Sequence, residues 1–176
     1  MLARIFDYIQ RLYIRRASNR ARIYYYRKQG IKIGNDCLIG EVLVASEPFL
    51  VEIGDHVAIA NDVTFVTHDG GLWCYGENES EFDVFGRIRI GNNVHIGIKC
   101  IFLPNTSIGD NCIIGAGSVV RGSFADNSVI VGNPAQVVTK MNVQKFIYSQ
   151  SLGRVRTAKI PFNQKVPIIK KHFGVE

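Results

Sequence analysis

The sequence predicts an all-β solenoid, a parallel β-helix of about four coils, and three observations support this fold. An aliphatic or phenylalanine residue recurs every six positions, glycine usually follows it, and a small, β-branched or cysteine residue usually stands four positions after it. A period of six fits neither a helix of about 3.6 residues per turn nor a lone amphipathic strand. It fits very short strands separated by tight corners, with three hexads in each triangular coil.

The recurring residues, called rungs below, are expected to point inward and to stack on their equivalents in the next coil. They are Ile33, Ile39, Ile53, Ile59, Phe65, Ile90, Ile96, Phe102, Ile108, Ile114 and Val120. Glycine follows seven of these eleven residues, although the whole chain holds only 17 glycines. The expected stacked pairs are Ile53 with Ile90, Ile59 with Ile96, and Phe65 with Phe102.

Composition limits the class of protein. With 47% hydrophobic and 20% charged residues in 176, the chain has the profile of one globular domain. It lacks an apolar stretch of about 20 residues, which favours a cytoplasmic protein. Cys37, Cys100 and Cys112 fall on the small inward position of the repeat, so core packing explains them better than a metal or a disulfide.

The net charge of +6 is concentrated at one end of the chain. Residues 1–30 carry a net charge of +7 and the remainder −1, so the body is not expected to bind nucleic acid. Apolar residues at Ile5, Ile9 and Leu12 predict an amphipathic helix in residues 1–30. This helix is expected to cap the solenoid end or contact a subunit, with contact to an anionic membrane as an addition.

The remaining boundaries follow from the repeat. Residues 31–140 form the solenoid domain, and residues 141–176 form a short helix to about Ser149 followed by an extended tail. Between Phe65 and Ile90 the repeat breaks, and residues 71–89 are expected to leave the solenoid as a loop. This loop is aromatic and acidic, and it is expected to wall a pocket or to clamp a neighbouring subunit. Its aromatic and acidic residues are Trp73, Tyr75, Phe82, Phe85, Glu77, Glu79, Glu81 and Asp83.

Four segments carry a resemblance to a known family. IGNNVHIG (90–97), IIGAGSVV (113–120) and VGNPAQVV (131–138) resemble the signature of the hexapeptide-repeat acyltransferases. THDGG (67–71) resembles the active-site region of their sugar and polysaccharide O-acetyltransferase branch. The resemblance implies a left-handed β-helix, a homotrimer, acetyl-CoA as co-substrate without a metal, and a sugar or glycan hydroxyl as acceptor. A lipid-linked acceptor would place the protein at the inner face of the membrane.

The resemblance also implies roles for individual residues. His68 becomes the general base, because a histidine near neutral pKa takes the hydroxyl proton and returns one to the thiolate. Asp69, Glu47 or a backbone carbonyl is expected to orient it. The residues expected to bind coenzyme A are Gly97, Gly115, Ala116, Gly117, Arg121, Asn133, Pro134 and Lys140. Those expected to line the acceptor pocket are Asp69, Trp73, Tyr75 and Asn105.

Other functions stay open on the sequence alone. An N-acetyltransferase acting on an amino-sugar nucleotide would need His68 as the same general base. A non-catalytic β-helix could use the same surface for assembly. A zinc carbonic anhydrase on this fold is not favoured, because His56, His68 and His95 fall on different parts of the repeat. His95 is expected to border the pantetheine channel or a subunit contact.

Overall fold

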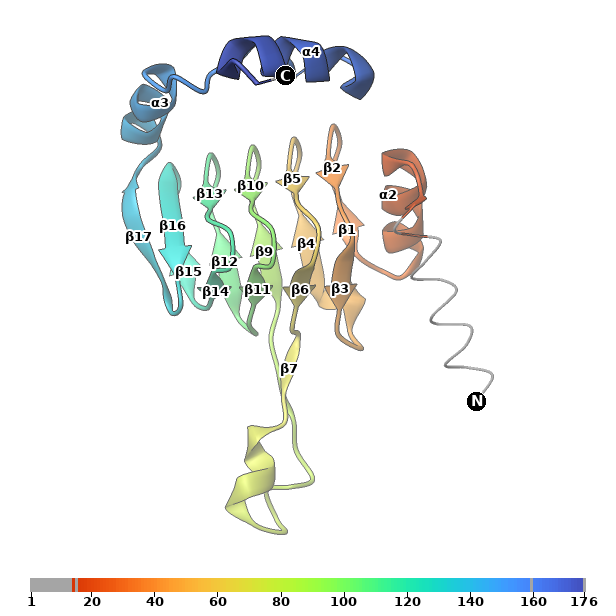
Figure 1. Cartoon of the computed structure of the whole chain (residues 1–176). Coiled ribbons are helices and arrows are strands. Elements are labelled where there is room, and N and C mark those ends of the chain that lie inside the picture. Colours follow the sequence, from red (N-terminus) through yellow and green to blue (C-terminus); the bar gives the residue numbers. More distant parts are fainter. Residues whose placement is uncertain (1–13, 15, 159, 176) are drawn as a thin grey trace. The chain divides into compact units, whose positions relative to one another are not determined.

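The computed structural model describes residues 14, 16–158 and 160–175. These residues form two compact units, a body that ends at Met141 and a C-terminal unit that starts at Asn142. The body is a β-solenoid of about five turns (Figure 1). Four coils are complete, and β15 and β16 begin a fifth before the chain reverses into β17. None of the described helices is long and apolar enough to cross a bilayer.

Three parallel sheets form the faces of the solenoid. The charged face consists of β1 (Lys32–Ile33), β4 (Val51–Ile53), β9 (Ile88–Ile90), β12 (Thr106–Ile108) and β15 (Ser123–Phe124). The histidine face consists of β2 (Leu38–Ile39), β5 (Ala58–Ile59), β10 (His95–Ile96), β13 (Ile113–Ile114) and β16 (Ser128–Gly132), with β17 (Ala135–Lys140) antiparallel at its edge. The apolar face consists of β3 (Val42–Val44), β6 (Val63–Phe65), β11 (Ile101–Phe102) and β14 (Val119–Val120).

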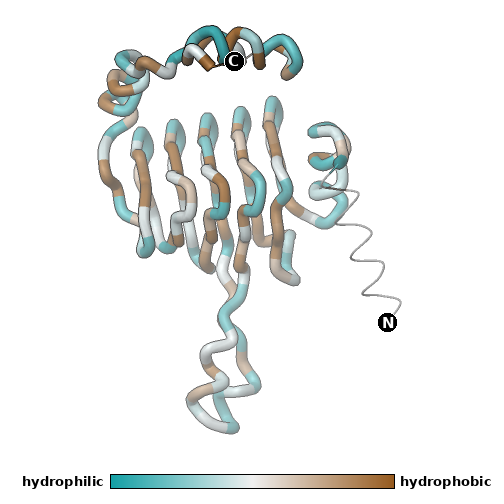
Figure 2. The backbone as a smooth tube through the Cα atoms, in the orientation of Figure 1, coloured by the Kyte–Doolittle hydropathy of each residue, from teal (hydrophilic) through white to brown (hydrophobic). Residues whose placement is uncertain are grey.

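The core confirms the six-residue repeat. All eleven rungs are buried, and each of the three expected pairs is aligned between neighbouring coils. Phe65 and Phe102 stack with their ring centroids 5.2 Å apart. Cys37, Cys100 and Cys112 are buried among the rungs as free thiols. Figure 2 shows the corresponding pattern, with hydrophobic residues along the strands and hydrophilic residues at the turns.

The corners explain the glycines and asparagines of the repeat. A Cβ added to Gly91 would lie 2.8 Å from the carbonyl of Gly109 in the next coil, so this close approach excludes any side chain. Other corner residues adopt a left-handed φ, among them Asn93 at 55° and Asn105 at 62°. Asparagine tolerates this conformation better than most residues, which fits its use at these corners.

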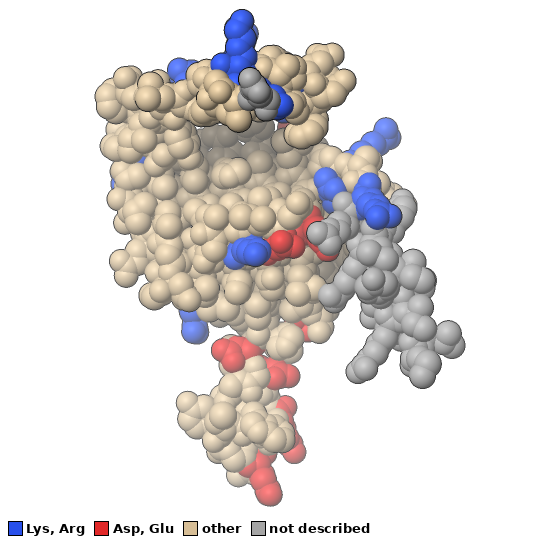
Figure 3. All heavy atoms as spheres, viewed as in Figure 1, with Lys and Arg blue, Asp and Glu red and all other residues tan. Residues whose placement is uncertain are grey.

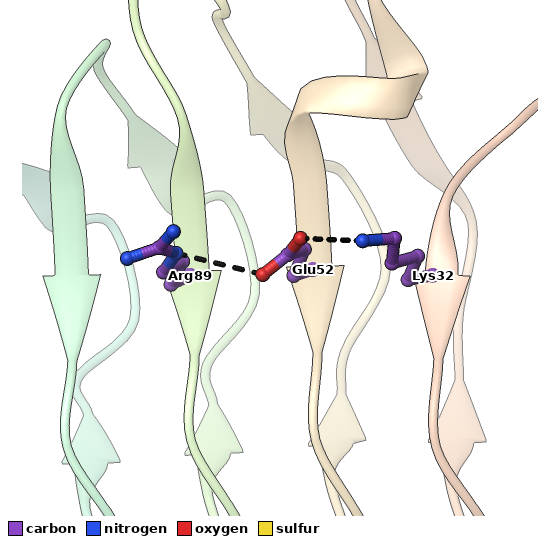
Figure 4. Close-up of polar contacts among 3 residues, drawn as sticks. All are labelled: Lys32, Glu52 and Arg89. Atoms are coloured by element: carbon purple, nitrogen blue, oxygen red, sulfur yellow. Dashed lines mark hydrogen bonds and ion pairs between the residues drawn. The ribbon is translucent and has the colours of Figure 1, made fainter.

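The outer surfaces of the three faces differ. On the charged face, Glu52 accepts a hydrogen bond from Lys32 Nζ at 2.8 Å and lies 3.5 Å from Arg89 Nε (Figure 4). The Lys32 ammonium, with Arg89 as a smaller contribution, lowers the pKa of Glu52 despite its desolvation. By contrast, Leu43 and Ile101 point outward from the apolar face and are 49% and 37% exposed. Of these two surfaces, the charged face is suited to permanent contact with water and the apolar face is not.

Helix α2 (Asn19–Lys28) caps the first coil. Asn19 donates to the carbonyl of Cys37 and accepts from the amide of Ile39, both at 2.8 Å, and Arg22 Nε donates to the Ile39 carbonyl at 2.7 Å. These bonds satisfy backbone groups that a bare edge strand would offer to another chain. The capping role expected for residues 1–30 is thus confirmed for α2, whereas the other expectations for residues 1–13 and 15 lie outside the described residues.

The expected loop is an extruded hairpin (Figure 1). Strands β7 (His68–Asp69) and β8 (Val84–Phe85) pair antiparallel as its stem, and a 3₁₀ helix, η2 (Gly71–Tyr75), follows β7. Strand β9 already begins at Ile88, so the insertion ends earlier than residue 89. Figure 3 shows acidic side chains along the hairpin.

The C-terminal unit differs from its prediction in one respect. Helix α3 (Met141–Ser149) lies where the sequence predicts a helix, but the expected extended tail contains a second helix, α4 (Phe162–Phe173). The prediction of a tail from Pro161 and Pro167 was wrong for two reasons. Pro161 lies at the N-cap, where a missing N–H costs nothing, and Pro167 sits inside the helix without ending it.

The packing of the core generates a stability prediction for two neighbours on β9. Ile90→Ala should lower the free energy of unfolding by about 2 to 5 kcal/mol, because it removes buried methyl groups from a stacked column. Arg89→Ala should lower it by less than about 1 kcal/mol, since it removes only an exposed ion pair. Urea denaturation at one protein concentration measures the free energy of unfolding of both variants. Equal losses would contradict the inward stacking of Ile90.

Candidate active site

His68 lies where the solenoid departs from its repeat. The corner between the apolar and charged faces, called the His68 corner below, holds Asn105 one coil further on. His68 occupies the slot equivalent to Asn105 but adopts strand conformation, because the hairpin stem starts there. The hairpin returns over the next coil, where the backbone of Gly86 lies against Asn105. The structure therefore brings His68 and Asn105, which is expected to line the acceptor pocket, to one corner.

A second irregularity places a carboxylate beside His68. Between β3 and β4 the repeat is interrupted by a 3₁₀ helix, η1 (Pro48–Leu50), and Glu47 immediately precedes it. Glu47 Oε2 lies 2.9 Å from His68 Nδ1 and accepts a hydrogen bond from Thr67 Oγ1 at 2.7 Å. Of the candidates for orienting His68, Glu47 is the one in contact with its ring. Thr67, which is fully buried, is a site residue that sequence reasoning missed.

The hydrogen bonds set the protonation of the pair. The hydrogen bond from Thr67 and then that from His68 lower the pKa of Glu47, which favours the carboxylate. The hydrogen bond to Glu47 raises the pKa of His68, against an opposing effect of desolvation. Because a carboxylate can only accept, Nδ1 of His68 carries the proton and Nε2 keeps the lone pair. The ring is 38% exposed and is arranged to take a proton at Nε2.

Hairpin residues surround the other side of the ring. The Phe85 ring centroid lies 6.0 Å from that of His68, and the charges of Asp83 and Asp69 add to the rise in the histidine pKa. Asp69 also accepts a hydrogen bond from the amide of Gly71 at 2.9 Å, which fixes the turn after β7. Asp69 therefore has a structural task in addition to the acceptor contact that the resemblance implies.

Trp73 and Tyr75 do not close a pocket within one chain. They lie in η2 and are 77% and 76% exposed. A hollow of about 460 Å³ lies on the outer surface of β3 and β6. It is lined by Leu43, Val44, Ala45, Ser46, Thr64, Phe65 and Val66. Its lining runs directly into the segments that hold Glu47 and Thr67.

The small residues expected to bind coenzyme A lie in one column. Gly97 follows β10, Gly115 follows β13 and Asn133 follows β16, at the corner between the histidine and apolar faces, called the glycine corner below. A Cβ on Gly97 would lie 2.5 Å from the amide of Ala116, so coil packing alone requires this glycine. Gly117 has a φ of 71° and open space beside it, and Asn133–Pro134 is a cis peptide at the β16–β17 turn.

The two expected phosphate-binding cations lie elsewhere. Arg121 follows β14 at the His68 corner. Lys140 pairs with Ser128 at the open end of the β16–β17 hairpin, about 13 Å from the Gly132–Ala135 pair at its turn, since β16 spans four steps of about 3.3 Å per residue. Within one chain the structure thus does not bring Arg121, Lys140 and the glycine corner together. The glycine corner and His68 are likewise separated by the width of the apolar face.

The other histidines have different surroundings. His56 Nδ1 lies 2.8 Å from Asn93 Oδ1, and His95 lies on the histidine face between Ala58 and Ile113. His172 Nε2 lies 2.6 Å from the carbonyl of Leu152 within the C-terminal unit. In the part of the chain that the structure describes, no group of three or more metal-ligating side chains could hold a metal ion.

The His68–Glu47 contact predicts a shifted titration. The C–H NMR signals of His68 should titrate above the ordinary pKa of 6.5, because the ring proton is stabilised by the carboxylate. Glu47→Gln should move the midpoint to lower pH, since the neutral amide no longer stabilises the imidazolium. An unchanged midpoint in this variant would show that Glu47 does not control the pKa of His68.

Comparisons with known proteins identify relatives of this chain. Residues 87–122 match the family model described as bacterial transferase hexapeptide (six repeats). Protein CapG of Staphylococcus aureus is 39% identical over 142 residues, which cover 79% of this chain and 81% of CapG. The galactoside O-acetyltransferase of Escherichia coli (strain K12) is 34% identical over 120 residues, which cover 68% of this chain and 59% of that enzyme.

A solved structure shows the same architecture. The maltose O-acetyltransferase from Clostridium difficile 630 superposes with a TM-score of 0.53 at 25% identity, covering 78% of this chain and 86% of that one. The repeat, the corner histidine and the extruded hairpin thus occur in a chain that these enzymes resemble in both sequence and fold. The chain belongs to the hexapeptide-repeat acetyltransferase family.

Proposed function

We propose that the protein transfers an acetyl group from acetyl-CoA to a hydroxyl of a sugar or glycan, with His68 as the general base. The observation that supports this most directly is the Glu47–His68 contact of 2.9 Å at the base of the hairpin. The names of the relatives add the acceptor class, since the galactoside and maltose enzymes are O-acetyltransferases of sugars. An amino group on an acceptor remains a second target for the same base.

The mechanism follows from the protonation of the pair. Nε2 of His68 accepts the proton of the acceptor hydroxyl as its oxygen attacks the thioester carbonyl. Glu47 holds Nδ1–H in place and stabilises the imidazolium that forms. The imidazolium then returns its proton to the coenzyme A thiolate as the carbon–sulfur bond breaks. Thr67 helps to keep the Glu47 carboxylate in position through the hydrogen bond at 2.7 Å.

The glycine corner is proposed to hold the pantetheine of acetyl-CoA. The open space beside Gly117 lets an extended chain lie along this corner, past Gly97, Gly115 and Ala116. The turn at Asn133 and Pro134 closes the last coil beside it. Arg121 and Lys140 stay as proposed phosphate contacts, but they lie at other corners and would reach one coenzyme only across a subunit boundary.

A homotrimer would complete the site. His68 and the glycine corner lie on opposite edges of the apolar face of one chain, which favours a site assembled from two neighbours. The outward Leu43 and Ile101 of that face are exposed in the single chain and need cover. The hairpin, with Trp73 and Tyr75 more than three-quarters exposed, would then wall the acceptor pocket between subunits.

A coupled assay tests the proposed reaction. With acetyl-CoA and a panel of galactosides, glucosides and amino sugars, the purified protein should release thiol and add one acetyl mass to a hydroxyl. His68→Ala should lower kcat by about 10²-fold or more, because the positioned base is lost. The acidic limb of kcat/KM should lie above the ordinary histidine pKa of 6.5, since only the neutral ring accepts a proton.

His56→Ala is the matched control, because His56 is also an exposed corner histidine with one hydrogen-bond partner, and its kcat should change little. Retention of more than about a tenth of kcat by His68→Ala would show that another group takes the proton. Acetylation of amines alone would replace the O-acetyl assignment by an N-acetyl one. Absence of turnover with every acceptor, together with absent coenzyme A binding, would favour an assembly module.

The exposed apolar face also predicts the oligomeric state. Sedimentation equilibrium should give three times the 19.7 kDa mass of one chain at micromolar concentration. Ile101→Glu should shift this mass toward the single chain, because it buries a charge in the contact. A single-chain mass for the unmodified protein would contradict the proposed trimer.

A further inference from the structure

The C-terminal unit has a basic and apolar surface that the proposed acetyl transfer does not explain. Residues 142–176 carry seven lysines and arginines against one glutamate, whereas residues 31–141 carry a net charge of −7. Many of its large apolar side chains are exposed. They include Val143, Phe146, Ile147, Tyr148, Leu152, Phe162, Val166, Ile168, Ile169, Phe173 and Val175. A short unit that is both strongly basic and apolar at its surface is suited to a partner that offers negative charge and hydrocarbon.

Helix α4 arranges these residues in two groups. At 100° per residue, Phe162, Val166, Ile169 and Phe173 lie within an arc of about 60°, which forms an apolar stripe along the whole helix. All four side chains of the stripe are exposed, from 37% at Val166 to 81% at Phe162. The stripe therefore stays accessible within the C-terminal unit.

The lysines of α4 stand beside the stripe. By the same geometry, Lys165 and Lys170 lie on opposite sides of it, each about 40° from its edge. Lysine stems of this kind lie along an apolar surface while their ammonium groups extend to a polar boundary. Gly174, with a φ of 62°, and the amide of Val175, which donates to the Lys170 carbonyl at 2.9 Å, end the helix after the last basic turn.

We propose that the C-terminal unit binds the surface of an anionic lipid bilayer, with α4 lying in the interface plane. The stripe would enter the acyl boundary, and Lys165 and Lys170 would contact the anionic headgroups on either side of it. An anionic bilayer thus accommodates both the positive charge and the exposed apolar side chains of the unit. A nucleic acid offers the charge but no cover for Phe162 and Ile169, whereas a bilayer surface offers both.

Vesicle binding by the full-length chain tests this proposal. Sucrose-loaded vesicles of phosphatidylcholine and phosphatidylglycerol at 3:1 should sediment the protein, and pure phosphatidylcholine vesicles should do so much less. Binding should weaken as salt rises, because the surface potential is screened. Lys165→Gln combined with Lys170→Gln should weaken binding about 30-fold, or about fivefold for each lysine near the surface.

Helix α4 offers a matched pair for the apolar part. Ile168 and Ile169 are both 39% exposed, but Ile168 lies about 100° from the edge of the stripe. Ile169→Asn should weaken vesicle binding by about tenfold or more, since it removes a side chain from the acyl boundary. Ile168→Asn should change it by less than about twofold, because its side chain faces away.

Other outcomes would overturn the proposal. Equal binding to both vesicle types, equal effects of the two asparagine variants, or absence of vesicle binding would each exclude α4 as a bilayer contact. A lower sedimentation mass of Ile169→Asn would assign the stripe to a contact between subunits. Binding that is lost only when residues 1–30 are removed would assign membrane contact to the N-terminal segment. Acetyl transfer to a soluble acceptor should stay unchanged in all α4 variants, which separates this test from that of His68.

Discussion

The coil-to-coil stacking of inward side chains is the constraint on which the rest of the molecule depends. Each rung lies on its equivalent in the next coil, as Phe65 does on Phe102 with 5.2 Å between ring centroids. Because parallel strands are about 4.8 Å apart, corners such as those at Gly91 and Gly97 bring backbone close to backbone. This spacing leaves no room for a Cβ at Gly91, and it fixes every outward residue in register with its neighbours. The three faces with distinct chemistry are a consequence of that register.

The candidate site arises where this constraint is relaxed twice. The interruption between β3 and β4 places Glu47 outside the regular repeat, and the insertion after Thr67 lets the chain leave the solenoid at His68. Neither residue could adopt its position if the hexads continued, because a regular corner would place a left-handed residue there, as at Asn105. The rigid coils on both sides hold the two irregular segments 2.9 Å apart. Regular packing thus positions the side chains, and irregular segments supply them.

The sequence predicts the solenoid well because its signal is strictly local and repeated. Every rung is buried as its spacing requires, and the predicted pairings of Ile53, Ile59 and Phe65 are aligned. The contact between Glu47 and His68 is harder to predict, because it joins two interruptions that obey no period. Thr67 was missed for the same reason, although a buried hydroxyl needs a partner. Helix α4 was missed because two prolines outweighed an apolar spacing that continues across Pro167.

The distribution of charge and apolar surface links assembly to catalysis. The charged face is suited to contact with water, because Lys32 and Arg89 pair with Glu52 on its surface. The apolar face needs cover, and this face separates His68 from the glycine corner. In the proposed trimer, covering that face and completing the site are therefore the same event. A substitution on the apolar face, such as at Ile101, would then lower activity while leaving the Glu47–His68 pair intact. Loss of activity alone would not identify a catalytic residue on the apolar face. The pKa of His68 distinguishes loss of assembly from disruption of the Glu47–His68 pair.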